Sequence, residues 1–387
     1  MPQDIVFHLP FAADVSPDAD DARRRSLDWC GRRGLVAHPV NRQRFLRWDI
    51  AGLMAAWVPR ATGERLDLTV DAVVVATFLD DQFDGPLAAQ PRRVAAACRA
   101  FTDVIASGGA APAGAGPLVG AFAQVWRRLA HRASPDWLES TGQHWQWYLN
   151  AYAEEAGNRA HRHVPTRAEY FALRRRSGFV YAMLDLSQRA YGFELPPRLY
   201  ADPTVRRMLD ITADVVDTLN DVHSVEKEES RGDLHNLVLV IEHELGCDRD
   251  TAIVEIQRLI HSWCAEFVAL EDRLGKRTPG EDITGEDTVG EDTVGERALG
   301  QDALGEDALG QDALGQDALG QDIAGKDAPG DGPPGPPRAD TAVVARLTDC
   351  MRSAMSGYLH WSRVSLRYSQ PVPPDEPALV TDLLTGG

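Results

Sequence analysis

Two acidic clusters, each preceded by an apolar run, constrain the fold of this chain more than any other feature. The first spans residues 80–84 and follows the apolar residues 73–79. The second spans residues 220–228 and follows residues 215–219, which are apolar except for Asp217 and Thr218. Apolar runs of this kind are typical of buried helices. Carboxylates that end a buried helix would face a cavity, so the two clusters predict a polar site inside a helical protein.

The side chains of both clusters are hard oxygen ligands at helical spacing. Asp80 and Asp84 lie four residues apart and therefore share one face of a helix, about one turn apart. Asn220, Ser224 and Glu228 repeat at i, i+4 and i+8. An all-oxygen set suits magnesium and does not suit zinc. Acidic residues at this spacing also occur on solvated helix faces, and each cluster alone leaves that alternative open.

Together the clusters resemble the aspartate-rich motif and the N-D-x-x-S-x-x-x-E motif of the class I terpene synthases, specifically the bacterial terpene cyclases. The resemblance covers most of the chain. It implies an all-α fold, a single class I terpenoid synthase-like helical bundle. It also implies that Asp80, Asn220, Ser224 and Glu228 hold three magnesium ions around a substrate diphosphate, with Asp84 as a supporting carboxylate.

Three cationic or hydroxyl residues extend the resemblance. Lys227 matches the diphosphate-binding lysine of the family. Near the C-terminus, Arg367 and Tyr368 match an adjacent arginine and tyrosine that hydrogen-bond the diphosphate. All three are therefore expected at the diphosphate.

Residues 170–178 resemble the segment that carries the family's diphosphate-sensing arginine. On this register the sensor is Arg174, the linker is Ser177 and the effector is the carbonyl of Gly178. Arg174 is followed by two more arginines, and consecutive helical residues point in different directions. We therefore expect Arg174 to face inward and its neighbours to form a basic surface.

The chemistry explains these residue types. A prenyl diphosphate is inert until its C–O bond breaks, which leaves an allylic carbocation and a highly charged diphosphate. Magnesium, cationic side chains and a tyrosine hydroxyl would neutralise that diphosphate and trigger ionisation without a covalent nucleophile. Water would quench the cation, whereas aromatic faces stabilise it, so the cavity walls must be apolar. The wall candidates are Phe78, Phe83, Trp147, Phe179 and Trp361. Core packing is the favoured role of Phe83, Trp147 and Phe179, and an equal alternative for Phe78 and Trp361.

Substrate length depends on the residues one helical turn before Asp80. These are Ala76 and Thr77, at positions where bulky aromatic side chains would shorten the pocket. The pocket therefore has room for a C20 chain, although C15 substrates are commoner in the family. Farnesyl and geranylgeranyl diphosphate both stay open as substrates, and the product depends on a pocket contour that the sequence does not reveal.

A repeat divides the chain. Helical periodicity runs through residues 1–274 and returns in residues 339–387, which we expect to complete the same helical core. Between them, in residues 275–338, glycine recurs every five residues among Asp, Glu and Gln. A five-residue period matches neither a helix nor a strand, so this segment is predicted to be a disordered acidic linker. A stacked solenoid is the alternative.

Charge and cysteine content limit the partners and the compartment. The repeat segment carries 15 acidic and 5 basic residues, more than half of the net charge of −18, and this acidity argues against a nucleic acid partner. The N-terminus lacks the features of a secretory signal, and no apolar run is long enough to span a bilayer. The five scattered cysteines indicate reduced thiols, so the protein is expected to be cytoplasmic. The sequence leaves open whether the chain forms a homodimer.

The sequence thus favours a magnesium-dependent terpene cyclase, a lyase that ionises a linear prenyl diphosphate, releases diphosphate and forms a sesquiterpene or diterpene. A chain-elongating prenyl diphosphate synthase is less compatible, because such enzymes carry a second D-D-x-x-D motif where this chain has Asn220, Ser224 and Glu228. A non-catalytic acidic repeat protein is the third possibility. Residues 18–21 spell the D-x-D-D acid motif of class II cyclases, but a polar stretch surrounds them.

Overall fold

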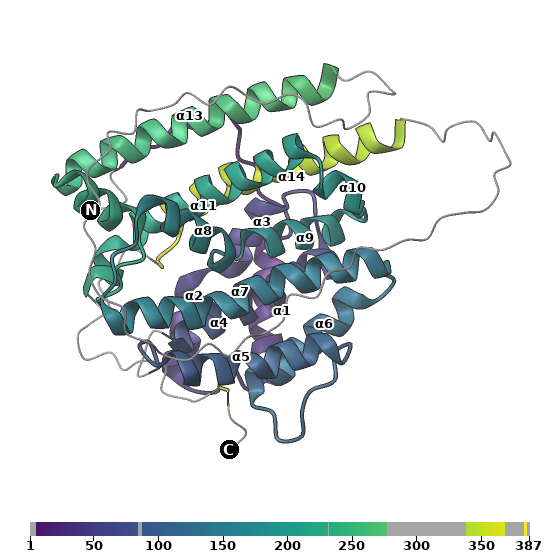
Figure 1. Cartoon of the computed structure of the whole chain (residues 1–387). Helices are drawn as coiled ribbons and strands as arrows, with labels where there is room; N and C mark the ends of the chain where they lie inside the picture. The colour runs from purple at the N-terminus through teal and green to yellow at the C-terminus, as the bar shows by residue number, and fades with distance from the viewer. Residues whose placement is uncertain (1–4, 84–86, 231, 277–337, 368–382, 385–387) are drawn as a thin grey trace, which may run out of the picture. The chain divides into compact units, whose positions relative to one another are not determined.

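A computed structural model of the chain describes residues 5–83, 87–230, 232–276, 338–367 and 383–384. Every regular element within these ranges is an α-helix (Figure 1), which confirms the all-α fold. The helices of the first half are α1 Ala19–Arg32, α2 Pro39–Trp48, α3 Ile50–Trp57, α4 Gly63–Phe83, α5 Pro91–Ala106, α6 Pro117–Ala130 and α7 Pro135–His161. Those of the second half are α8 Arg167–Ser177, α9 Val180–Tyr191, α10 Pro197–Tyr200, α11 Pro203–Ser230, α12 Leu237–Leu245, α13 Arg249–Lys276 and α14 Arg338–Val364.

Several expected residues lie outside the described ranges. Asp84 and Tyr368 are among them, and so are residues 277–337, which contain almost all of the predicted acidic linker. Helix α14 follows this segment and packs against α3 and α11. The C-terminal helix therefore belongs to the same helical core as the helices that precede the repeat.

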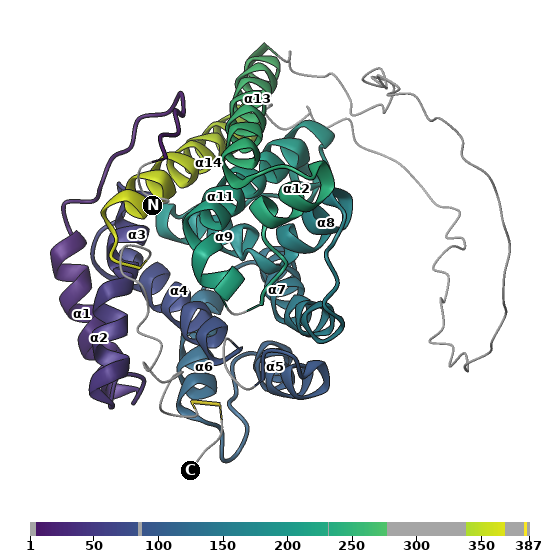
Figure 2. The same ribbon diagram turned by 90° about the vertical axis from the view of Figure 1, so that its left-hand side faces the viewer.

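Helices α4 and α11 carry the two acidic clusters and lie in the interior of the bundle. Helix α4 contacts α1, α3, α6 and α9, and its residues 72–76 are all buried. Helix α11 contacts α8, α9, α12, α13 and α14. Helix α9 packs against both and lies between them in Figure 2. The apolar runs thus bury their helices, and the polar residues at the helix ends face one another across the core.

A sharp break separates α8 from α9. Helix α8 begins with a capping box, in which Thr166 and Glu169 satisfy each other's backbone N–H groups. It ends at Gly178, and the next residue, Phe179, has a left-handed backbone with φ of 65°. A left-handed φ is rare for an aromatic residue. The chain therefore turns abruptly here, directly beside α11.

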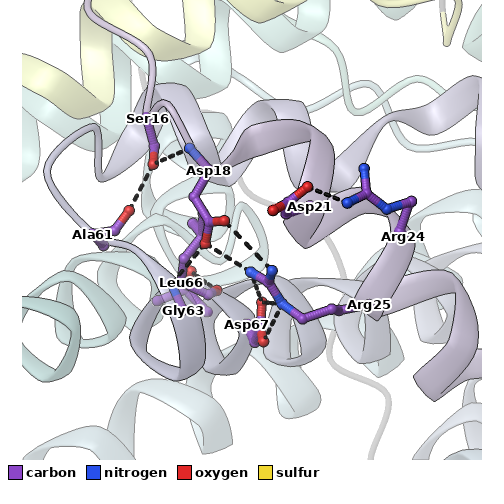
Figure 3. A network of polar contacts seen from close by, with 10 residues as sticks. Ser16, Asp18, Asp21, Arg24, Arg25, Ala61, Gly63, Leu66 and Asp67 are labelled. Atoms are coloured by element: carbon purple, nitrogen blue, oxygen red, sulfur yellow. Dashed lines mark hydrogen bonds and ion pairs between the residues drawn. The ribbon is translucent and has the colours of Figure 1, made fainter.

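In the D-x-D-D sequence near the N-terminus, Asp18 forms hydrogen bonds that join α1 to α4 (Figure 3). Asp18 accepts hydrogen bonds from Arg25 Nη2 at 2.7 Å and from the Gly63 backbone N–H at 2.6 Å. Arg25 also donates to Asp67, at 2.8 Å from Nε. The Arg25 hydrogen bond is the main cause that lowers the pKa of Asp18. An aspartate held ionised in this way attaches α1 to α4 and is unsuited to protonating an alkene.

None of the helices in the described ranges is long and apolar enough to cross a membrane.

Candidate functional site

A cavity in the helical core is lined by residues of α3, α4, α7, α8, α9, α11 and α14. Both acidic clusters contribute to its wall, together with Arg174, Lys227 and Arg367. Apolar and aromatic side chains line another part of it, namely Ile50, Leu53, Val73, Ala76, Phe83, Phe179, Met183, Val216 and Trp361. The cavity thus has charged groups beside an apolar surface.

The α4 wall presents Asp80 to the cavity. The residues of α4 that line it are Val73, Ala76, Thr77, Asp80 and Phe83, and their spacing of three and four defines one helix face. The Tyr152 hydroxyl donates to Asp80 Oδ1 at 3.2 Å. Arg367 Nη2 lies 3.6 Å from Asp80 Oδ2, and the Asp80 side chain is 43% exposed. This carboxylate is therefore accessible from the cavity.

The α11 wall presents Asn220, Ser224, Lys227 and Glu228. The Asn220 side-chain amide donates to the Tyr358 hydroxyl at 2.8 Å, and the Ser224 hydroxyl donates to the Asn220 carbonyl at 2.9 Å. Asn236 Nδ2 donates to Glu228 Oε2 at 2.9 Å. Tertiary contacts therefore orient Asn220 and Glu228, and the backbone of α11 itself orients Ser224.

Burial and neighbouring carboxylates affect Glu228. Desolvation, followed by repulsion from Asp221 and Asp233, raises the pKa of Glu228 to about 8. Like charges close together in a poorly solvated site favour the protonated form. The cavity therefore has an excess of acidic groups that a cation would neutralise.

The three consecutive arginines of α8 point in three directions. Arg174 Nη2 donates to Asn220 Oδ1 at 2.8 Å and lies 2.9 Å from Asp221 Oδ1. Arg175 instead pairs with Asp214, at 2.7 Å from Nε and 2.8 Å from Nη2. Arg176 pairs with the exposed Glu154 at 2.8 Å. Of these three side chains, Arg174 is the one that lines the cavity.

Asp221 anchors Arg174 to α11. Its carboxylate is fully buried and accepts hydrogen bonds from the Tyr170 hydroxyl and, at 2.6 Å, from the Leu237 backbone N–H. A buried carboxylate is tolerated when donors and a cation satisfy it. Asp221 thus supports the arginine from behind.

The break between α8 and α9 forms another part of the wall, through Ser177, Gly178 and Phe179. A Cβ atom at position 178 would lie only 2.0 Å from Asp217 Oδ1. Any side chain other than hydrogen would displace that carboxyl group. Glycine is therefore required here by the close approach of α11.

The C-terminal segment closes the cavity beside the α4 wall. Trp361 lines the cavity and donates its indole N–H to the Asp49 carbonyl at 3.0 Å. The guanidinium of Arg367 lies 5.6 Å from the ring centroid of Trp48, a cation–π distance. Arg367 is thereby held next to Asp80.

Two of the wall candidates do not line the cavity. Phe78 lies about 100° around α4 from Thr77 and packs against Phe45 and Trp48 instead of lining the cavity. Trp147 packs against His144 and Tyr181, also away from the cavity. Phe78 is fully buried in the core and Trp147 is half-buried, and their helices present other faces to the site.

Several cavity residues have no counterpart in the sequence motifs. Arg159 donates to Asp233 Oδ2 at 2.7 Å and to the Ala88 carbonyl at 2.7 Å, so a cation of α7 also reaches the polar end. The others are Tyr148, Tyr152, Glu155, Asp217, His235 and Tyr358. Asp217 follows two valines just ahead of the second cluster. This position in a buried helix is the feature of the sequence that could have identified it as a cavity residue.

The donor set fits a hard divalent cation. Within the described ranges, no three His, Cys, Asp or Glu side chains are grouped as a metal site. The face of α11 instead offers an amide oxygen, a hydroxyl and a carboxylate, all on the cavity wall. Oxygen ligands of this kind suit magnesium. Thiolate and imidazole groups that would favour zinc do not contribute to this face of α11.

Comparisons with known proteins agree with this arrangement. A family model described as terpene synthase family 2, C-terminal metal binding, matches residues 71–266, which include both acidic clusters. A pentalenene synthase of Streptomyces avermitilis is 36% identical over 280 residues, which cover 71% of this chain and 82% of that protein. A 7-epi-alpha-eudesmol synthase of Streptomyces viridochromogenes is described as (2E,6E)-farnesyl diphosphate cyclizing. It is 32% identical over 277 residues, which cover 71% of this chain and 81% of that protein.

Solved structures give the same fold. A linalool/nerolidol synthase from Streptomyces clavuligerus aligns with a TM-score of 0.71 at 26% sequence identity, over 92% of this chain and 100% of that one. The fold therefore has experimentally determined counterparts.

Proposed function

Because the chain belongs to the terpene synthase family and is a class I terpene cyclase, we propose that it converts farnesyl diphosphate to a cyclic sesquiterpene with magnesium as its cofactor. The eudesmol synthase that it resembles is described as cyclizing farnesyl diphosphate. Geranylgeranyl diphosphate is the second candidate, because Ala76 and Thr77 are small residues one helical turn before Asp80, where bulky side chains would shorten the pocket.

The observation that carries the proposal is the convergence of the two acidic clusters on one cavity. Asp80 reaches it from α4, and Asn220, Ser224 and Glu228 reach it from α11. Clusters on solvated faces would not share a wall with aromatic side chains. These four residues, with Asp84, would hold three magnesium ions, which supply the positive charge that stabilises the leaving diphosphate.

Cationic side chains of the chain itself would bind the diphosphate. Arg174, Lys227 and Arg367 all line the cavity, and Tyr368 directly follows Arg367. Arg174 is held at the face of α11 by Asn220 and Asp221, so its guanidinium is already oriented when an anion arrives. Preorganised donors of this kind stabilise charge that develops as a bond breaks.

The apolar part of the cavity would fold the isoprenoid chain and exclude water. Phe179 and Trp361 contribute aromatic faces, and Leu53 and Met183 contribute aliphatic surface. An aromatic face stabilises a nearby cation, whereas a water molecule would end the reaction early. The contour of these side chains would determine which rings form.

The test is a direct assay. The purified full chain is incubated with magnesium and separately with geranyl, farnesyl and geranylgeranyl diphosphate, and hexane extracts are analysed by gas chromatography–mass spectrometry. We expect a cyclic C15 hydrocarbon or alcohol from farnesyl diphosphate, and no product after chelation with EDTA. Turnover of geranylgeranyl diphosphate alone would overturn the substrate assignment. Products that are longer diphosphates, formed when isopentenyl diphosphate is added, would indicate an elongating synthase instead.

A further inference from the structure

One carboxyl group in the cavity has no part in the proposed magnesium and diphosphate site. Asp217 lies on α11, about one turn before Asn220, and its residue is only 3% exposed. It lines the cavity together with Val216, Phe179 and Met183. This acid therefore lies where the isoprenoid chain is expected, beyond the ligands that would hold the metal.

Asp217 differs from the other buried acids of α11 in its contacts. Asp214 receives two hydrogen bonds from Arg175, and Asp221 receives donors from Tyr170 and Leu237. The Oδ2 atom of Asp217 has no hydrogen-bond partner in the part of the chain that the structure describes. An ionised carboxylate without donors is costly to bury, so such a group is stable as the neutral acid.

The charged groups around Asp217 do not reverse this preference. Arg174 and Arg175 of α8 favour the ionised form, whereas the neighbouring Asp214 and Asp221 of α11 oppose it. Desolvation is the largest effect and raises the pKa of Asp217 to about 8. The carboxyl group therefore carries a proton at neutral pH and can regain it after giving it up.

The break after α8 fixes the position of this acid. The space above Gly178 that a side chain would fill holds the Asp217 carboxyl group, with Oδ1 and Oδ2 only 2.0 and 2.3 Å from an ideal Cβ. Motion of the carboxyl group toward α8 is thereby limited. The result is an oriented acid whose Oδ2 atom has no hydrogen-bond partner among the described residues, on a cavity wall that it shares with Val216, Phe179 and Met183.

We propose that Asp217 is the proton donor of the cyclisation, which converts a neutral polyene intermediate into a second carbocation. This inference rests on the proposed action on a prenyl diphosphate. It assigns a reaction in which ring closure occurs in two stages, separated by a neutral intermediate, and it makes Asp217 a catalytic residue in addition to the diphosphate site.

The proton transfers in this series of reaction steps balance. The first cation loses a proton to the released diphosphate and becomes a neutral cyclic polyene. The Asp217 O–H then breaks, its electron pair stays on the carboxyl oxygen, and an alkene π pair forms the new C–H bond, which leaves a tertiary cation. After further ring closure the Asp217 carboxylate removes a neighbouring proton, and that C–H electron pair forms the final alkene. The enzyme regains its acid, and the net loss is one diphosphate and one proton.

The experiment compares the wild-type chain and Asp217→Asn in H₂O and in D₂O, with magnesium and farnesyl diphosphate. In D₂O the exchangeable Asp217 proton becomes deuterium, so we expect the main wild-type product to gain one mass unit. Asparagine is similar in shape but is not an acid, so Asp217→Asn should accumulate the neutral intermediate without deuterium. Asp214→Asn is the matched control, since Asp214 is a buried acid on the same helix that pairs with Arg175, and it should keep the deuterated product.

Each outcome decides the proposal. A wild-type product without deuterium overturns it, as does a deuterated product of unchanged identity from Asp217→Asn. If Asp217→Asn fails to fold, as judged by circular dichroism, the wild-type deuterium result and Asp217→Glu decide, because glutamate keeps an acid and should keep the label. Failure of the proposed function is distinct, because the wild-type chain would then give no terpene from any prenyl diphosphate.

Discussion

The two walls of the cavity that carry the acidic clusters are held differently. On α11 the three expected ligands contact Tyr358, the Asn220 carbonyl and Asn236, and Arg174 bridges to the same helix. On α4, Asp80 is 43% exposed and contacts Tyr152 and Arg367, the latter at 3.6 Å. The α11 wall is thus preorganised by a hydrogen-bond network, whereas Asp80 on the α4 wall is more exposed and lies farther from Tyr152 and Arg367, at 3.2 and 3.6 Å.

This difference indicates how the site would work. A rigid wall fixes the position of metal and diphosphate, because its side chains need little reorganisation. A wall with longer contacts can adjust when the ligand binds. We therefore expect substitutions on α11 to affect turnover most, and substitutions beside α4 to affect mainly substrate binding.

The largest effect is expected at the α11 ligands. Asn220→Ala and Glu228→Ala each remove an oxygen ligand from the rigid wall, so the turnover number should fall by roughly 10³-fold or more. Helical circular dichroism should be retained, because neither side chain fills the apolar core. The matched control is Glu226→Ala, an exposed acid on the same helix, which should keep wild-type turnover. Near-normal activity of both ligand variants would contradict the metal assignment.

The next largest effect separates the three arginines. Arg174→Ala should lower turnover by roughly 10²-fold, since it removes the guanidinium at the ligand face. Arg175→Ala should keep most activity but lower the free energy of unfolding by about 2 kcal/mol, because it removes two hydrogen bonds to the buried Asp214, which retains Arg207 at 3.9 Å. Arg176→Ala should change neither quantity. Steady-state kinetics and urea denaturation measure the two effects. Equal loss of activity in all three variants would refute the assignment of Arg174 as the diphosphate-sensing arginine.

On the α4 wall the expected effect is smaller and of a different kind. Arg367→Lys keeps the charge but loses the planar guanidinium that lies over Trp48 and can bind phosphate oxygens through two donors. We expect KM to rise about tenfold with a smaller change in kcat, since a loss of about 1.4 kcal/mol in binding corresponds to that ratio. A change confined to kcat would contradict the proposed division between the walls.

The same comparison explains what could be predicted from the sequence. Spacing of three and four residues along α4 and α11 was enough to place Asp80, Asn220, Ser224 and Glu228 on cavity faces. Phe78 was misassigned because an apolar helix buried on every side gives no signal about which face meets the cavity. The direction of each face depends on the neighbouring helices.

Other parts of the site depend on contacts between distant segments. Arg159 reaches the polar end from α7, and Tyr358 reaches Asn220 from α14, 138 residues further along the chain. Neither side chain lies in a motif, so tertiary packing alone brings them to the cavity. That Asp217 Oδ2 has no hydrogen-bond partner among the described residues is likewise a property of its surroundings, because its helix contains paired acids one turn away on either side.

The smallest effect is expected when residues 277–337 are replaced, because the residues proposed to act in the reaction lie outside this segment. We predict that a Gly-Ser linker long enough to join α13 to α14 will leave the product profile unchanged, since loop-closure free energy changes by only about 0.6 kcal/mol per doubling of length. At low salt the rate of substrate association should rise slightly, because the net negative charge of this acidic repeat would be removed and an anionic substrate would be repelled less. Gas chromatography–mass spectrometry and kcat/KM at two salt concentrations measure both effects. An altered product mixture would mean that the repeat contributes to the cavity contour, and the two walls would not be sufficient for the reaction.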